Sequence, residues 1–133
     1  MADRITRRII CIIICAGMAL LAAACSSGTD KASYVLYYTN SERNKLIERT
    51  CNIADDMSDE EKVRTLLSDM NVRSAGKDEY IIKPENVNLV DVSIKGKTVN
   101  LNYTTTYKQM SAQTELLFRA AVVKLLTQIE DIN

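Results

Sequence analysis

The sequence predicts a small α+β domain with elements in the order β-α-β-β-α: a two-layer fold with one small sheet and both helices on one face of it. Three observations predict this class. A segment of β-branched and aromatic residues opens the domain, two apolar stripes recur at helical spacing, and one alternating segment folds back on itself around Gly96. All three lie within residues 34–133, a length that suits one domain with one core.

Residues 1–24 are predicted to be a lipoprotein signal peptide. Arg7 and Arg8 belong to a basic start, the apolar run of residues 9–21 follows, and three alanines lead to Cys25. A membrane-spanning helix needs roughly 20 apolar residues, so this run suits a signal better than a span. An uncleaved signal anchor is the alternative.

Cys25 is the candidate site of lipidation. A cysteine directly after a small-residue cleavage site resembles the lipobox of bacterial lipoproteins, whose thiol receives a diacylglyceryl group carrying acyl chains such as palmitate. Ala22 departs from that pattern, since leucine is commoner there. Residues 25–33 are polar and are expected to be a tether that holds the domain near the bilayer. The expected location is the outer face of the cytoplasmic membrane.

Composition excludes several functions. The chain has 17 basic and 17 acidic residues and no histidine. Loss of the arginine-rich signal leaves a small acidic excess, so no nucleic-acid partner is expected. After Cys25 only Cys51 remains, which excludes a disulfide within the mature chain and a zinc site built on cysteine and histidine. We expect no metal, no cofactor and no enzymatic activity, because no nucleophile–base or acid–base pair is visible.

The first elements follow from local patterns. Residues 34–39 are β-branched and aromatic and predict a strand, and residues 45–53 could form a short extended segment. Ser58 and Glu61 have the spacing of a capping box, and the apolar stripe after them predicts a helix to about Val72. Residues 77–87 are predicted to form an irregular connector.

Residues 89–95 and 98–103 form the clearest hairpin, with apolar and polar residues alternating on both sides of Gly96. The last helix is expected to begin near Ser111. Its main apolar stripe suits packing on the sheet and consists of Phe118, Ala121, Val122, Leu125 and Ile129.

A second apolar strip lies elsewhere on this helix and is the candidate protein interface. It consists of Leu116, Leu117, Ala120 and Val123. Surplus apolar surface on a domain of this kind marks a contact with a partner or a second copy. The alternative is that residues 45–53, or a further strand after the helix, cover the strip.

Four stretches carry a family resemblance: residues 35–40 (VLYYTN), 82–87 (IKPENV), 92–101 (VSIKGKTVNL) and 122–128 (VVKLLTQ). In this order and spacing they resemble the GerMN domain family, the module of GerM-type sporulation and spore germination lipoproteins. The resemblance covers residues 34–133.

This resemblance implies a non-enzymatic module whose fold is similar to the ring-building motifs of secretion-type channels. Such modules pack side by side into membrane-associated rings or dock on envelope complexes. The family commonly continues into a short strand after the last helix, whereas this sequence ends at Asn133. Either the chain is a fragment or that edge has no strand.

For three other features, a structural role is expected and not a functional one. The acidic run of residues 55–61 lacks the ligand spacing of a calcium loop and suits a helix N-terminus. Cys51 is expected to be an inert thiol, with activation by Arg49 as the alternative. Five tyrosines could offer a stacking platform for sugars but are expected to pack in the sheet: Tyr34, Tyr37, Tyr38, Tyr103 and Tyr107.

The expected function is therefore a membrane-anchored scaffold or assembly module of the cell envelope, in sporulation, germination or general upkeep. The alternative is an envelope-binding module that recognises a glycan or a small ligand through its tyrosines.

Overall fold

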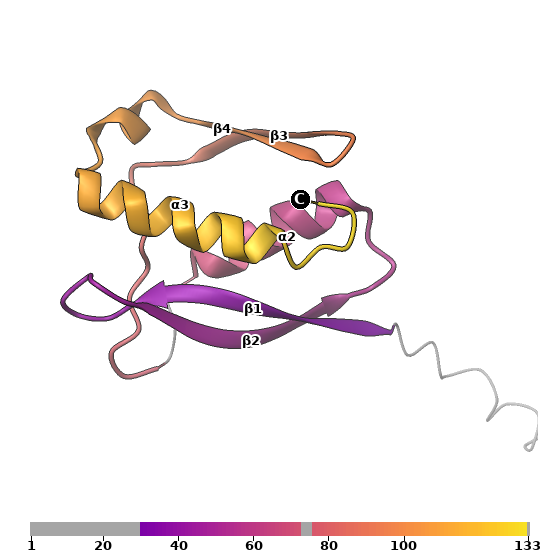
Figure 1. The fold of residues 1–133 in the computed structure, drawn as a ribbon, viewed down its shortest axis with the longest axis horizontal. Helices are drawn as coiled ribbons and strands as arrows, with labels where there is room; N and C mark the ends of the chain where they lie inside the picture. Colours follow the sequence, from indigo (N-terminus) through magenta and orange to yellow (C-terminus); the bar gives the residue numbers. More distant parts are fainter. Residues whose placement is uncertain (1–29, 73–75, 133) are drawn as a thin grey trace, which may run out of the picture.

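The computed structural model describes residues 30–72 and 76–132 (Figure 1). Its elements are strands β1 and β2, helix α2, strands β3 and β4, the short 3₁₀ helix η1 and helix α3. Their bounds are Lys31–Thr39, Leu46–Ala54, Asp59–Met70, Leu89–Lys95, Thr98–Tyr103, Thr105–Gln109 and Ala112–Leu126. This content confirms a small α+β domain. The predictions for the signal peptide and for Cys25 lie outside the described residues.

The first hairpin joins β1 and β2 in antiparallel register. β1 begins at Lys31 and not at the expected Tyr34, so residues 31–33 belong to the sheet and not to the tether. The reason is the length of β2: the extended segment expected at residues 45–53 is a full strand, and its last residue, Ala54, pairs with Lys31.

β1 contacts both helices through adjacent tyrosines. The Tyr38 hydroxyl donates to the Asp69 carbonyl of α2 at 3.2 Å. The Lys124 amine of α3 lies 5.2 Å from the centroid of the Tyr37 ring. Both tyrosines are buried, so β1 is the strand around which the helices pack.

The second hairpin joins β3 and β4 with the predicted bounds. Gly96 has a φ of +60°, which a glycine adopts without steric cost in a two-residue turn. Val92 opposes Leu101, and the register shifts at a bulge between Leu89 and Asp91.

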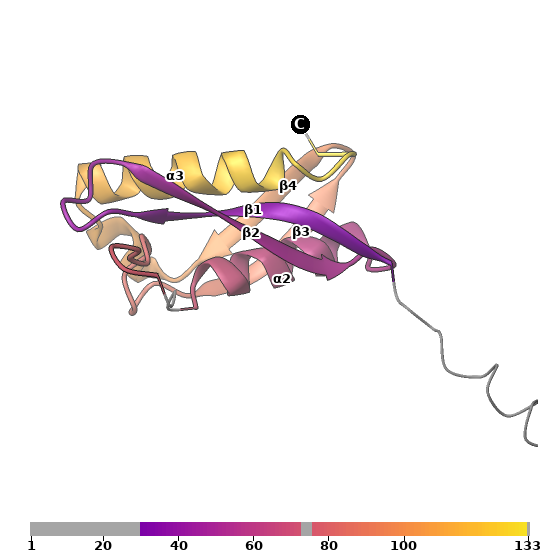
Figure 2. The same cartoon turned by 90° about the horizontal axis from the view of Figure 1, so that it is seen from below.

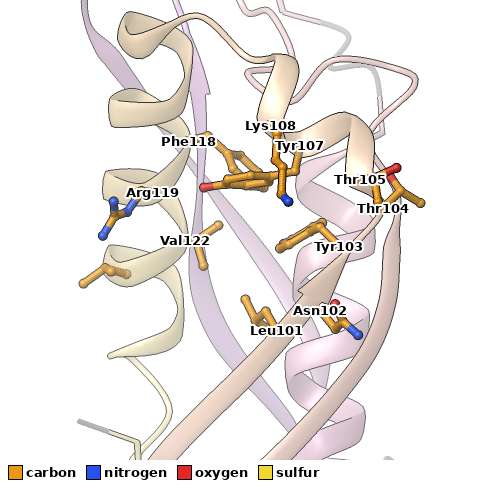
Figure 3. Close-up of a pocket in the computed structure, with 11 residues that line it drawn as sticks. Leu101, Asn102, Tyr103, Thr104, Thr105, Tyr107, Lys108, Phe118, Arg119 and Val122 are labelled. Atoms are coloured by element: carbon orange, nitrogen blue, oxygen red, sulfur yellow. The ribbon is translucent and has the colours of Figure 1, made fainter.

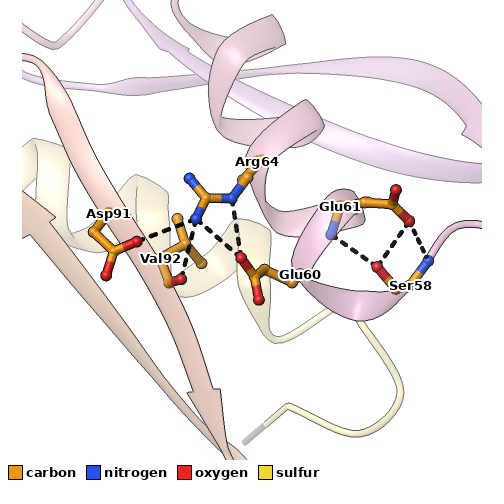
Figure 4. Close-up of polar contacts among 6 residues, drawn as sticks. All are labelled: Ser58, Glu60, Glu61, Arg64, Asp91 and Val92. Atoms are coloured by element: carbon orange, nitrogen blue, oxygen red, sulfur yellow. Dashed lines mark hydrogen bonds and ion pairs between the residues drawn. The ribbon is translucent and has the colours of Figure 1, made fainter.

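The two helices begin where the sequence predicts. The Ser58 side chain accepts from the Glu61 main-chain N–H, and the Glu61 carboxylate accepts from the Ser58 N–H, which completes the predicted capping box of α2 (Figure 4). The Ser111 side chain accepts from the Thr114 N–H at the start of α3. Helix α2 ends at Met70, slightly before the expected Val72.

The helices lie side by side, with the β1–β2 hairpin on one side of them and the β3–β4 hairpin on the other (Figures 1 and 2). The expectation of one sheet in a two-layer fold is corrected in this respect, because the strands form two separate two-stranded sheets. The main stripe of the last helix faces the core as expected, and its residues Phe118, Ala121, Val122 and Leu125 are buried. Ile129, expected to continue this stripe, is also buried but lies after the helix, which ends at Leu126.

Side chains and connectors explain why the two sheets stay separate. The Gln128 side chain bonds both main-chain groups of Val35 in β1, at 2.7 Å to the N–H and 2.9 Å to the carbonyl. Tyr80, in the irregular connector, exchanges two main-chain hydrogen bonds of 2.9 Å with Thr39 at the end of the same strand. β1 is therefore already bonded along the edge that does not face β2.

Candidate functional site

A groove of about 550 Å³ lies between β4, η1 and α3 (Figure 3). Strand β4 contributes Leu101, Asn102 and Tyr103; the next segment contributes Thr104, Thr105, Tyr107 and Lys108; helix α3 contributes Phe118, Arg119, Val122 and Val123. The groove exists because the β3–β4 hairpin covers the helices incompletely. Val92 is buried, whereas Val99, Leu101 and Tyr103 on the same face of the hairpin are only half-buried.

Three aromatic rings form the floor of the groove. The Tyr103 and Tyr107 rings are stacked, with centroids 5.6 Å apart and planes at 30°. Phe118 meets Tyr103 edge-on at 5.6 Å and 77°. This geometry is favourable for aromatic side chains, so the rings of β4, η1 and α3 pack as one cluster.

Both tyrosine hydroxyls stay protonated near neutral pH. Burial, with a contribution from Tyr107, raises the pKa of Tyr103 to about 12. Burial and the nearby Glu115 raise the pKa of Tyr107, whose hydroxyl lies 3.4 Å from a Glu115 carboxylate oxygen. The lining residues include no carboxylate and no thiol, so the groove presents hydroxyl, amide and cationic groups beside apolar ones.

Two cations line the groove. Lys108 is exposed on η1, and Figure 3 shows its side chain beside the tyrosine rings. Arg119 is exposed on α3 and lies 3.8 Å from Glu115 in a long ion pair. An exposed pair of this length is weak. The groove therefore combines an apolar floor with a positive margin.

The predicted interface strip on α3 divides into two parts. Leu116 and Val123 are 71% and 60% exposed. Leu117 is half-buried and packs against the core, and Ala120 is also half-buried. Val123 lines the groove, so the exposed part of the strip adjoins the groove along α3.

The tyrosines do not form one platform. Tyr34, Tyr37 and Tyr38 are buried in the core, as the packing interpretation expected. Tyr103 and Tyr107 are half-buried and line the groove instead. Lys108 and Arg119, which line the groove beside these tyrosines, were not predicted from the sequence. The pattern that could have indicated the groove is the pair Tyr103 and Tyr107, four residues apart and next to a hairpin.

The acidic run and Cys51 agree with the structural roles predicted for them. Glu61 belongs to the capping box, and Asp55 pairs with Lys62 at 3.3 Å. Burial, and then Asp69, raises the pKa of the half-buried Cys51 thiol, which disfavours the reactive thiolate. Within residues 30–72 and 76–132, no cluster of three cysteine or carboxylate side chains could hold a metal ion.

Comparison of the chain with protein-family models, with curated proteins and with solved structures finds no match. The GerMN resemblance therefore stays a prediction carried by the four sequence stretches. None of the described helices combines the length and apolar character needed to cross a membrane.

Proposed function

We propose that this chain is a lipid-anchored, non-enzymatic assembly module of the cell envelope, held on the outer face of the cytoplasmic membrane through Cys25. The resemblance to the GerMN family favours a role in sporulation or spore germination, and general upkeep of the envelope is the alternative. Two acyl chains on Cys25 would give stable attachment, where one chain would be marginal.

The observation that carries the assembly role is the apolar, exposed part of α3. Leu116 and Val123 lie two helical turns apart on one face of the helix and are the two most exposed residues of the predicted interface strip. They adjoin a groove whose floor is apolar. Exposed apolar side chains that continue into an apolar groove are typical of a protein contact.

A charged substitution on this face of α3 tests the proposed contact. Leu116→Arg should leave the thermal melt of the chain almost unchanged, because the residue is exposed, while it abolishes co-purification of partners from detergent-solubilised membranes. Val72→Arg is the matched control, since Val72 is 60% exposed on a different part of the surface. Equal recovery of partners with both variants would reject the α3 contact.

A second candidate function is recognition of a glycan or a small ligand in the groove. The stacked pair of Tyr103 and Tyr107, half-buried and beside Lys108, favours it. Sedimentation of the chain with purified cell wall, lost in Tyr107→Ala but kept in Tyr80→Ala, would support this role. Tyr80 is 46% exposed and lies outside the groove lining.

A further inference from the structure

Strand β4 has an open edge whose hydrogen-bonding groups can be assigned. Lys95 and Thr98 flank a two-residue turn and are paired in register. In such a hairpin the flanking pair is hydrogen-bonded and the pairs then alternate. Val99 and Leu101 therefore direct their main-chain N–H and C=O groups away from β3, toward the free edge.

The arrangement of β3 agrees with this assignment. Val92 opposes Leu101, so its carbonyl should also point away from the partner strand. Arg64 of α2 donates to this carbonyl at 3.2 Å (Figure 4). The same guanidinium pairs with Asp91 at 3.3 Å, and the bulge at Leu89 interrupts the strand. The outer edge of β3 is thus blocked.

The edges of the other hairpin are blocked as well. Gln128 and Tyr80 bond the main chain of β1 at two points. β2 carries the exposed charged residues Glu48 and Arg49 on its two faces, and charged side chains on an edge strand discourage strand pairing. Within the described residues, β4 differs from all three. It contains no charged residue, no proline and no bulge of its own, and only β3 pairs with it.

The inner face beside this open edge can receive side chains. Val99, Leu101 and Tyr103 are half-buried there, and Val122 and Val123 form the opposite wall of the groove. A strand added to β4 presents every second side chain to this space. The edge and the groove together therefore suit an extended segment with apolar residues at alternate positions.

The basic residues near the two ends of β4 indicate which kind of segment could pair with this strand. Lys97 lies directly before β4, and Lys108 and Arg119 lie at the other end, beside the groove. A second copy paired antiparallel about Leu101 would bring Lys97 next to Thr105 of the other chain, close to that chain's Lys108. Such pairing would place like charges together at both ends, which is unfavourable.

We propose that the β4 edge and its groove bind an extended segment of another protein, with alternating apolar residues and carboxylates at both ends, by β-strand addition. The segment would form a third strand beside β4. This inference rests on the proposed assembly role and names the binding mode and the partner's chemistry.

The probe is a synthetic fluorescein-labelled peptide of alternating valine and threonine, with two glutamates at each end. A matched peptide carries lysines in place of the glutamates. Fluorescence anisotropy with the full chain in detergent should detect saturable binding of the acidic peptide and at least tenfold weaker binding of the basic one. Lys108→Glu combined with Arg119→Glu should weaken the acidic peptide about tenfold and improve the basic one. Lys31→Glu, an exposed charge reversal at the start of β1, is the control and should change neither.

A second variant tests the main-chain contact itself. Val99→Pro removes an N–H that points to the free edge and leaves the bonds to β3 in place, so it should reduce binding of both peptides with little loss of fold by circular dichroism. Binding equal to wild type in Val99→Pro would overturn strand addition, even if the charge reversals act as expected.

Three other results would overturn the proposal. One is failure of the acidic peptide to bind. Another is a dimer of the chain alone that Val99→Pro dissociates, which would assign the edge to a second copy. The third is displacement of the peptide by soluble glycan fragments of cell wall, which would assign the groove to sugars. Loss of partners in Leu116→Arg without any peptide binding would leave the assembly role intact and reject only this inference.

Discussion

Leu125→Ala should strongly destabilise the domain, and its cost can be worked from the structure. Leu125 is fully buried, at 0% exposure. The substitution removes about three buried carbons at about 0.8 kcal/mol each, or about 2.4 kcal/mol. The cavity that remains adds to this, so the expected loss in the free energy of unfolding is about 3–4 kcal/mol. For a domain of about 100 residues the thermal midpoint should fall by about 12 °C or more.

Val123→Ala is the matched control for this prediction, because Val123 lies on the same helix but is 60% exposed. Its cost should stay within about 0.5 kcal/mol. Urea unfolding of the full chain followed by far-ultraviolet circular dichroism measures both variants. Equal stability of the two variants would refute the assignment of the core face of α3 and, with it, the reason for regarding Val123 as free to contact a partner.

Three further predictions concern the helix cap, the groove and the free thiol. Ser58→Ala should cost about 1 kcal/mol in urea unfolding, because it removes the hydroxyl that accepts from the Glu61 N–H; a cost near zero would contradict the capping box. Wild-type stability should fall as pH rises from about 10 toward 12, because Tyr103 ionises near 10 when unfolded and at about 12 when folded. Tyr103→Phe should lack this part of the loss, so parallel pH profiles for the two proteins would count against a buried hydroxyl. Cys51, whose pKa burial raises, should react with iodoacetamide more slowly in the folded chain than in urea, and equal rates would show an exposed thiol.

Local patterns predicted much of the fold. The capping box at Ser58, the N-cap at Ser111 and the hairpin around Gly96 each depend on residues close in sequence, and each lies where it was expected. The main stripe of the last helix was also correct, because the period of its apolar residues determines which face is buried.

Pairing between distant segments was harder to predict. Nothing in the pattern of β1 reveals that Gln128, far along the chain, bonds both main-chain groups of Val35. That contact and the bridge of Thr39 to Tyr80 help to divide the strands into two sheets, where one sheet was expected.

The candidate site was predicted only in part. The exposed Leu116 and Val123 belonged to a predicted interface strip, because an apolar residue away from the main stripe is visible on a helical wheel. The groove was not predicted, since it depends on how far the β3–β4 hairpin covers α3 and on the 3₁₀ turn that stacks Tyr107 on Tyr103. Both are properties of packing between elements, which a single sequence does not report.

The most direct test of the proposed role is the mass of the mature protein purified from membranes of cells that make the full chain. The account predicts a chain that begins at Cys25, lacks residues 1–24 and carries a diacylglyceryl group on that cysteine, with no such species in Cys25→Ala. A chain that retains residues 1–24, or one with an unmodified Cys25 thiol, would contradict the lipid anchor and the envelope role built on it.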